Sequence, residues 1–243
     1  MKAGAVNLIR CSDASALGQA GADVVLQALA ASPEPVIGAA TGSSPSPLYS
    51  ALAASGADFS TATWFALDEY VGLPPGHPES YAEVLRREIV QPLGLDPRRV
   101  HLPDPHRVDL HDAARRYEQQ IAAAGGIDLQ ILGIGRNGHL AFNEPGAALD
   151  SRTRLEALTE DTRRANRRFF DSLEDVPTQC LTQGLGTIME ARHLLLIARG
   201  REKAEALARA LTGTVSTDCP ASVLQTHAQV TVLADEAAAS LLD

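Results

Sequence analysis

The stretch GIGRNGHLAFNEPG, residues 133–146, places glycines in the spacing G-x-G-x-x-G from Gly133 onward. This spacing is typical of a turn that holds a dinucleotide pyrophosphate, where the glycines run straight into a helix and an acidic residue follows about 20 positions later. Here Pro145 and Gly146 end any helix almost as soon as it could begin. The glycines also follow a late predicted strand, whereas a dinucleotide turn usually follows the first. We therefore expect no dinucleotide cofactor.

A second interpretation explains more of the same stretch. Glycines after a strand let the backbone approach a ligand closely. Histidine titrates near neutral pH, so His139 could transfer protons, and Glu144 could fix its tautomer and raise its basicity. A single loop histidine is more often structural than catalytic. The hypothesis therefore depends on which residues the fold brings next to His139.

Another loop has the chemistry of an anion site. The predicted strand 35–40 is followed by a polar loop and by a helix that starts near Pro45 or Pro47. Hydroxyls and free backbone N–H groups at the start of a helix bind phosphate well. A serine that only caps the helix would give the same sequence, so this alternative stays open. The loop residues are Thr41, Gly42, Ser43 and Ser44.

Two further strand ends carry charge. Asp68 and Glu69 follow the apolar run TWFAL, and because neighbouring residues of a strand point to opposite sides, at most one of them should face a site. Lys203 follows the predicted strand 193–200 and lies in the first turn of a helix, where the helix dipole disfavours a cation. A phosphate partner explains this lysine better than a structural role does.

Two charged clusters are less specific. The run DTRRANRRFF, residues 161–170, predicts either a solvated basic face or one arginine that reaches a phosphate. Histidines and aspartates between residues 101 and 111 fit no standard zinc spacing, and Pro103 and Pro105 indicate a surface loop there. We expect no metal ion.

Strand and helix patterns alternate along the chain. Strands are predicted at 35–40, 63–70, 98–103, 127–135, 193–200 and 229–235, and helices at 12–32, 46–56, 81–90, 111–126 and 201–213. This alternation predicts an α/β fold with one open, mostly parallel, Rossmann-like sheet and helices on both faces. No long linker divides residues 1–243, so we expect a single domain. Ligands of such sheets bind outside the carboxyl ends of the strands, where the four polar loops would converge.

Composition limits the function further. The chain has 243 residues, of which 45% are hydrophobic and 21% charged, as in an ordinary globular protein. A net charge of −9 argues against a general partner such as nucleic acid or an anionic membrane. The three cysteines are scattered and suggest neither a disulfide framework nor a metal site. With no long apolar segment, a cytoplasmic protein is the expectation.

The motifs together resemble those of glucosamine-6-phosphate deaminase, within the wider group that includes 6-phosphogluconolactonases. The resemblance runs from about residue 36 to 235 and rests on ATGSSP, LDEYVGLPPGHPESY, GIGRNGHLAFNEPG, SRTR, DTRRANRRFF and GREKAEAL, in that order. Lactonase relatives typically lack DEYVGL and FNEP, so the resemblance favours the deaminase. It implies a cofactor-free conversion of glucosamine 6-phosphate and water to fructose 6-phosphate and ammonia.

The resemblance also implies roles for single residues. Asp68 would move a proton from C2 to C1 of the sugar through an enolamine. His139 would shuttle the proton that opens the pyranose ring, oriented by Glu144 and by Asn137, which stands where some relatives have Asp. Asn137 can hold a hydrogen bond but cannot ionise or relay a proton. The phosphate would be held by residues Thr41 to Ser44, by Arg168 and by Lys203.

Two other functions stay open: hydrolysis of a sugar-phosphate lactone, and a non-catalytic sugar-phosphate sensor. A sensor of that type would normally carry a DNA-binding segment, for which the chain has no spare N-terminal length. Some relatives are hexamers that an N-acetylated sugar phosphate activates. At the matching positions this chain has Ala147, Ala148 and Glu156 beside Arg154, which makes a poor anion site. We therefore expect an unregulated monomer or small homo-oligomer.

Overall fold

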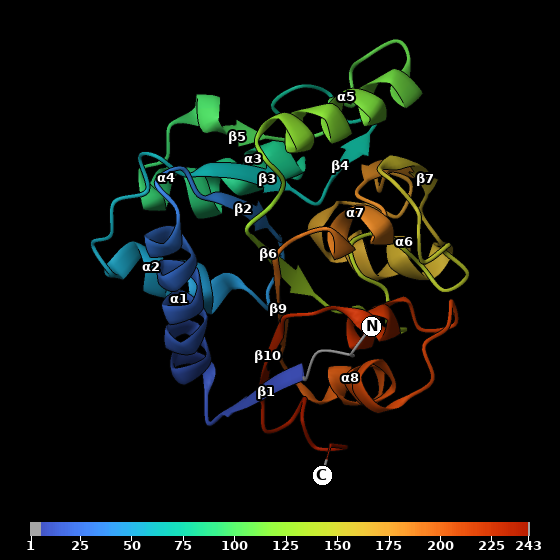
Figure 1. Ribbon diagram of the computed structural model, residues 1–243. Coiled ribbons are helices and arrows are strands. Elements are labelled where there is room, and N and C mark those ends of the chain that lie inside the picture. The colour runs from blue at the N-terminus through green and yellow to red at the C-terminus, as the bar shows by residue number, and fades with distance from the viewer. Residues whose placement is uncertain (1–5, 243) are drawn as a thin grey trace.

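The computed structural model describes residues 6–242, which form two sheets. The main sheet has seven parallel strands in the order β1-β10-β9-β6-β2-β3-β5 (Figure 1). A smaller antiparallel sheet has the order β4-β8-β7. The strands are β1 (Val6–Cys11), β2 (Val36–Ala39), β3 (Thr63–Ala66), β4 (Asp68–Val71), β5 (Val100–His101), β6 (Leu129–Gly133), β7 (Arg154–Ala157), β8 (Gln179–Thr182), β9 (His193–Ala198) and β10 (Val230–Asp235).

Helices cover both faces of the main sheet, as the sequence predicts. The α-helices are α1 (Ala14–Ala31), α2 (Ser46–Ala54), α3 (Tyr81–Leu85), α4 (Gln91–Leu93), α5 (Leu110–Ala123), α6 (Glu160–Asn166), α7 (Leu185–Met189) and α8 (Ala204–Thr212). A π-helix, η1 (Arg86–Val90), connects α3 to α4, and the 3₁₀-helices are η2 (Pro97–Arg99), η3 (Arg167–Phe169), η4 (Arg201–Lys203) and η5 (Pro220–Thr226). Figure 1 shows α1 and α2 on one side of the sheet and α7 and α8 on the other. α1 leads from β1 to β2 in one direction across the sheet, and α8 leads from β9 to β10 in the opposite direction. Because crossovers between parallel strands are right-handed, the two helices lie on opposite faces.

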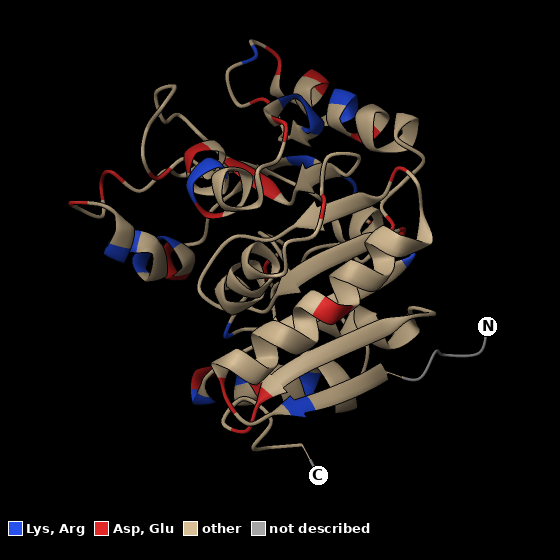
Figure 2. Cartoon of the chain, turned by 90° about the vertical axis from the view of Figure 1, so that its left-hand side faces the viewer, with Lys and Arg blue, Asp and Glu red and all other residues tan. Residues whose placement is uncertain are grey.

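The central strands are mostly apolar because both of their faces are covered, although β6 also buries the polar side chain of Gln130. In β9, every residue after His193 is buried, and β6 is buried from Leu129 to Leu132. Figure 2 shows the strands of the main sheet largely free of charged residues, which lie mainly in the surrounding helices and loops. The burial of this apolar sheet is the main source of stability for the fold. None of the helices within residues 6–242 is both long and apolar enough to cross a bilayer.

The predicted strand 63–70 is divided between the two sheets. β3 ends at Ala66 in the main sheet, and β4 begins at Asp68, which pairs with Thr182 in the small sheet. At the junction the carbonyl of Ala66 accepts hydrogen bonds from the hydroxyl of Tyr117 (2.6 Å) and the side-chain amide of Gln183 (2.9 Å). These side chains satisfy a buried carbonyl that would otherwise lose its partner where the strand leaves the sheet.

Among the strands, the sequence patterns do not predict β1, β7 or β8, and among the α-helices they do not predict α4 or α7. β7 and β8 lie in the middle of the chain, where hydrophobic residues follow no regular period, and each has four residues. β1 lies at the edge of the main sheet and most of its residues are only partly buried. Its parallel pairing with β10 makes this segment a strand, although its own sequence does not indicate one.

Candidate active site

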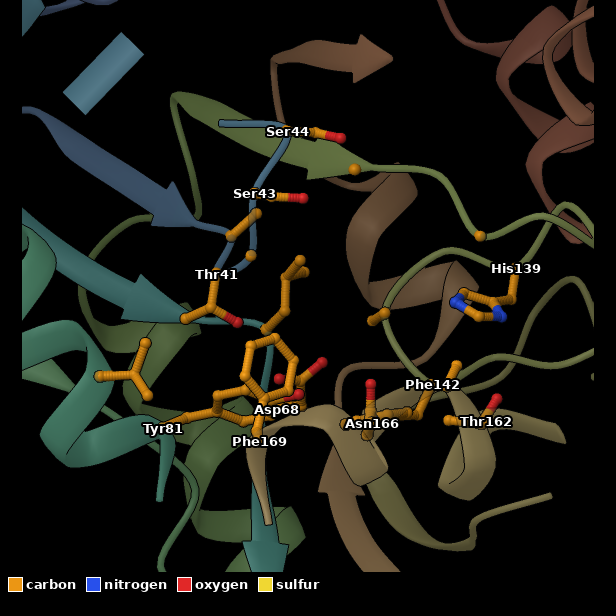
Figure 3. A pocket seen from close by; sticks show the side chains of 18 of the residues that line it. Thr41, Ser43, Ser44, Asp68, Tyr81, His139, Phe142, Thr162, Asn166 and Phe169 are labelled. Carbon is orange, nitrogen blue, oxygen red and sulfur yellow. The ribbon is translucent and has the colours of Figure 1, made fainter. Parts of the chain in front are cut away.

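A cavity of about 920 Å³ lies at the carboxyl ends of the main-sheet strands. In Figure 3, Thr41, Ser43 and Ser44 lie on one side of it and His139 on another, with Asp68 between them. Nine of the ten residues expected at a site line this cavity: Thr41, Gly42, Ser43, Ser44, Asp68, Asn137, His139, Arg168 and Lys203. The tenth, Glu144, lies behind His139. The convergence expected at the strand ends is therefore present in the structure.

The loop after β2 leaves its hydroxyls free of a capping role. The N-cap of α2 is Pro45, and no side chain makes a capping hydrogen bond there. Gly42 has a φ of +104°, a conformation that favours glycine and that turns the chain toward the helix. Arg199, at the end of β9, donates a hydrogen bond of 3.0 Å to the carbonyl of Ser43 and holds the loop from behind. The alternative of plain serine capping is therefore wrong.

Asp68 is a buried carboxylate that faces the cavity. Burial, with a smaller contribution from the neighbouring charge of Glu69, raises the pKa of Asp68 to about 8. Glu69 does not line the cavity. Its carboxylate accepts hydrogen bonds from the backbone N–H groups of Tyr70 (2.7 Å), Tyr81 (2.9 Å) and Ala82 (2.8 Å) at the start of α3. Of the two carboxylates, only that of Asp68 therefore faces the cavity, as the sequence predicts.

Glu144 connects three side chains next to the cavity. Its Oε2 atom lies 3.4 Å from Nδ1 of His139 and accepts a hydrogen bond of 2.5 Å from the amide of Asn137. Its Oε1 atom accepts a short hydrogen bond from the hydroxyl of Thr162. Burial would raise the pKa of Glu144, but the contacts with His139, Thr162 and Asn137 outweigh it and lower the pKa to about 2. Glu144 is therefore a fixed negative charge beside the imidazole.

Asn137 reaches His139 by a different route from the one expected. Its Oδ1 accepts a hydrogen bond of 3.2 Å from the backbone N–H of His139, while its amide group points to Glu144. It therefore positions the carboxylate rather than the imidazole. An aspartate in the same position would set two carboxylates against each other, so the amide suits this geometry better.

The glycine spacing makes room for the histidine. A Cβ atom at Gly135 would lie 2.3 Å from the ring of His139. At Gly138, φ is +89° and a Cβ atom would lie 2.6 Å from the sulfur of Cys219. The next α-helix along the described chain is α6, well beyond the turn, so no helix presents its N-terminus to a pyrophosphate here. Ala141, which lines the cavity, has a φ of +50°, the only positive value for a residue other than glycine within residues 6–242.

Cations gather at one end of the cavity. Lys203 is the last residue of η4. Burial, the largest influence, lowers its pKa, the neighbouring charge of Glu202 opposes this, and the charges of Arg136 and Arg168 lower it further. The guanidinium of Arg168 lies 4.6 Å from the ring centre of Phe169. Arg136 also lines the cavity but was not expected there, because its position within the glycine turn gives no signal of its direction. Together these side chains make an environment that favours an anion.

The four arginines of α6 and η3 divide into two groups. Arg164 and Arg168 line the cavity. Arg163 donates hydrogen bonds to the carbonyls of Leu173 and Val176, and Arg167 donates to the carbonyl of Asp171. The run is therefore neither a purely solvated face nor a purely functional one.

Several cavity residues escape sequence reasoning because their role depends on a partner far along the chain. The amide of Asn166 donates a hydrogen bond of 2.9 Å to the hydroxyl of Tyr70, and the hydroxyl of Tyr81 lies 3.3 Å from the same oxygen. These contacts tie α6 to β4, next to Asp68. The motif ESYAEV contains Tyr81, but only the stacking of its ring on Tyr70, at 4.7 Å, shows which way it points.

Two other segments singled out in the sequence lie apart from this chemistry. Residues 6–242 contain no group of three or more His, Cys, Asp or Glu side chains arranged to hold a metal ion, and this includes the loop 101–111. Arg154 forms an ion pair of 2.6 Å with Glu156 and donates a hydrogen bond of 2.9 Å to Asn143. Its guanidinium is therefore already engaged by a carboxylate.

The chain is similar to known proteins over most of its length. The model of the family described as glucosamine-6-phosphate isomerases/6-phosphogluconolactonase matches residues 12–233. A glucosamine-6-phosphate deaminase from Pseudarthrobacter chlorophenolicus is 55% identical over 229 residues, which cover 93% of this chain and 88% of the relative. One from Cutibacterium acnes is 52% identical over 241 residues, 98% of this chain and 92% of the relative.

Solved structures give the same result. A structure described as a monomeric glucosamine-6-phosphate deaminase superposes with a TM-score of 0.94 at 39% identity, covering 97% of this chain and 100% of that one. A 6-phosphogluconolactonase from Trypanosoma cruzi has a TM-score of 0.80 at 21% identity over 98% of this chain and 97% of its own, and shares the fold. The chain belongs to the family of glucosamine-6-phosphate isomerases and 6-phosphogluconolactonases.

Proposed function

We propose that the protein converts glucosamine 6-phosphate and water to fructose 6-phosphate and ammonia, without a cofactor. The observation that carries the proposal is the arrangement of one cavity: a buried carboxylate, a histidine backed by a second carboxylate, and a group of cations all face it. Identity of more than half with relatives named glucosamine-6-phosphate deaminase supports this substrate. Residues 1–243 would form one domain that carries the whole site.

Asp68 is the proposed base of the central step. In the open-chain substrate the carboxylate removes the proton from C2, which gives an enolamine, and returns it to C1, which gives a ketimine. Water then adds at C2 and ammonia leaves, so that the ketone remains. Its raised pKa of about 8 suits this role, because a base with a pKa near the working pH can both accept and return a proton.

His139 is the proposed catalyst of ring opening. The pyranose opens when a proton moves from the hydroxyl on C1 to the ring oxygen, and an imidazole near neutral pH can carry that proton. Glu144, held ionised, stabilises the imidazolium that forms in between. Asn137 serves by holding the carboxylate.

The phosphate is proposed to lie at the cationic end of the cavity. Lys203 and Arg168 supply charge, and Thr41, Gly42, Ser43 and Ser44 supply hydroxyls and backbone N–H groups at the start of α2. Binding energy at this end positions C1 and C2 at the other. Arg136 joins this group.

The protein is proposed to act as a monomer. Its support is the described monomeric state of a structural relative with a TM-score of 0.94. The proposed place of action is the cytoplasm, because a doubly charged sugar phosphate does not cross a bilayer unaided.

The test is to incubate the purified protein with glucosamine 6-phosphate and to measure both ammonia and fructose 6-phosphate. Equal amounts of both products are expected, before and after exhaustive chelation. Asp68→Asn should lower kcat by at least ~100-fold, the scale of general-base catalysis. Hydrolysis of 6-phosphogluconolactone without ammonia release would assign the protein to the lactonase branch instead. Activity that chelation removes and a divalent ion restores would contradict the cofactor-free reaction.

A further inference from the structure

The two oxygens of Glu144 have different partners. Oε2 faces Nδ1 of His139 and accepts from Asn137, whereas Oε1 accepts from Thr162 and lies 3.4 Å from the hydroxyl of Thr159. The carboxyl group is a terminal group whose last torsion has broad minima, so packing alone does not fix its plane. Donors on both oxygens do fix it. Thr162 supplies the short hydrogen bond at Oε1.

Thr162 is itself held rigidly. It is 7% exposed, and its backbone N–H donates a hydrogen bond of 3.2 Å to the hydroxyl of Thr159, the N-cap of α6. Its β-branched side chain has few rotamers on a helix. Figure 3 shows Thr162 close to His139 at the edge of the cavity. A rigid donor on a helix can therefore set the direction of a carboxylate that belongs to a loop.

The contact of His139 with Glu144 depends on such precision. At 3.4 Å, the Nδ1 to Oε2 distance is longer than a good hydrogen bond, and the buried Nδ1 has no other partner within residues 6–242. A small rotation of the carboxylate would either close this distance or remove the contact. Donation from Thr162 prevents the rotation that would carry Oε2 away from the ring.

We propose that Thr162 is a positioning residue for ring opening: its hydroxyl orients the Glu144 carboxylate so that Oε2 stays opposite Nδ1 of His139. This inference rests on the function proposed above. Thr162 does not act on the sugar itself, and it acts on the reaction through the imidazole. α6, which carries Thr162, continues into η3, which carries Arg168. One segment therefore supplies both the residue that orients the pair of Glu144 and His139 and a cation proposed for the phosphate.

The test compares three variants. Thr162→Val removes the hydroxyl and keeps the shape, and Thr162→Ser keeps the hydroxyl and removes a methyl group. Thr187→Val is the matched control, because the hydroxyl of Thr187 donates a hydrogen bond of 2.5 Å to the carboxylate of Glu118, away from the cavity. If Thr162→Val does not fold, as judged by circular dichroism, Thr162→Ala takes its place.

Thr162→Val should lower kcat for glucosamine 6-phosphate by about 10- to 100-fold, as expected when a catalytic group is misplaced by part of an ångström. The inhibition constant of glucosaminitol 6-phosphate, an acyclic analogue that needs no ring opening, should stay within about 2-fold, because phosphate binding is untouched. Thr162→Ser should keep most of the activity, and Thr187→Val all of it. An unchanged kcat in Thr162→Val, or equal losses in the Val and Ser variants, would overturn the proposal.

A readout without substrate separates this inference from the proposed function. The ¹⁵N shifts of the His139 ring should show one tautomer, protonated at Nδ1, in the unaltered protein and in Thr187→Val, and a mixture in Thr162→Val. The same tautomer in all three would overturn the positioning role even in an active enzyme. Absence of ammonia release from the unaltered protein, with the tautomer change present, would overturn the proposed function instead.

Discussion

Asp68 and Glu69 are adjacent in the chain, yet their carboxylates serve different parts of the molecule. Asp68 faces the cavity and gains a raised pKa from its burial, whereas Glu69 receives three backbone N–H groups, two of them at the start of α3. Burial raises the pKa of Glu69 as well, but its three donors oppose that rise, whereas no hydrogen-bond donor within residues 6–242 does so for Asp68. Opposite effects on stability should follow.

Asp68→Asn should stabilise the protein at pH 8. An unfolded aspartate loses its proton near pH 4, while the folded one keeps it up to about pH 8. Between these values the folded state binds more protons than the unfolded state, so the free energy of unfolding falls as the pH rises. Removing the group should raise that free energy by at least about 1 kcal/mol at pH 8, with a difference that shrinks toward pH 4. Thermal denaturation at both pH values measures this.

Glu69→Gln is the companion to that experiment. The amide has a single acceptor oxygen, so part of the backbone of Tyr70, Tyr81 and Ala82 loses its partner. A loss of about 1–3 kcal/mol is expected at pH 4, and a smaller loss at pH 8, because burial also raises the pKa of Glu69 and its ionised form stabilises the fold less. If both substitutions shifted stability in the same direction, the two carboxylates would not differ in the way described.

The pH dependence of kcat/KM should report the same carboxyl group. Because this ratio reflects the free enzyme, its acid limb should rise toward pH 8 as Asp68 ionises. The second ionisation of a phosphate lies near pH 6 and is distinct from it. Initial rates from pH 5 to 9 at low substrate concentration test this, and a limb that is complete by pH 6 would contradict it.

Lys203→Ala should weaken binding more than it slows chemistry. Phosphate is held alike in the ground state and the transition state, so loss of one charge-assisted contact of about 1.5–3 kcal/mol should appear mainly in KM. Arg201→Ala is the control, because Arg201 lies in the same turn, is exposed and does not line the cavity. A KM that is equal in both variants would place the phosphate elsewhere.

Gly135→Ala should reduce activity through sterics alone. The added Cβ would meet the ring of His139 at 2.3 Å and force it to move. Gly133→Ala is the control for contact with the protein, since a Cβ at this last residue of β6 would meet no protein atom within 4 Å although Gly133 also lines the cavity. A displaced catalytic histidine should cost about 100-fold in kcat for Gly135→Ala. Equal activity of both variants would show that His139 does not depend on this glycine.

Regulation by an N-acetylated sugar phosphate should be absent. Arg154 is paired with Glu156 at 2.6 Å, and alanines stand at positions 147 and 148, so an incoming phosphate would meet a carboxylate and an occupied guanidinium. We expect hyperbolic rate curves that N-acetylglucosamine 6-phosphate leaves unchanged, and a monomer by light scattering. Sigmoidal rate curves that become hyperbolic when N-acetylglucosamine 6-phosphate is added would show that Arg154 binds its phosphate in preference to Glu156.

The sequence predicts the parallel sheet and the cavity-facing loops because both follow from local patterns. Apolar runs such as HLLLIA indicate buried strands by themselves, and polar residues at their ends converge through the topology of the sheet. The break between β3 and β4 is not predictable in this way. TWFALDEY has the pattern of one strand, and the contacts that divide it come from distant parts of the chain: the hydroxyl of Tyr117 on α5, and the side chain and backbone of Gln183.

The contacts behind the site escape prediction for a similar reason. Thr162 lies within the motif DTRRANRRFF, and Arg199 directly precedes GREKAEAL, but neither motif indicates the partner of these residues. Each matters because of a group that the folded chain brings near: Glu144 for Thr162 and the carbonyl of Ser43 for Arg199. Arg136 lies inside a motif, yet its place among the cations depends on how the turn is folded. Local pattern thus predicts which loops meet, and long-range contact decides how their side chains are held.

Asp68 lies at the first residue of the small sheet, immediately after the chain leaves the main one. Its pairing with Thr182 joins segments that are far apart in sequence, and long-range pairings of this kind form slowly because closing a long loop costs entropy. A refolding chain that had formed only the main sheet would possess the anion loop after β2 but no placed base. Catalytic activity therefore requires the two sheets to be joined, and its rate of recovery cannot exceed the rate of that joining.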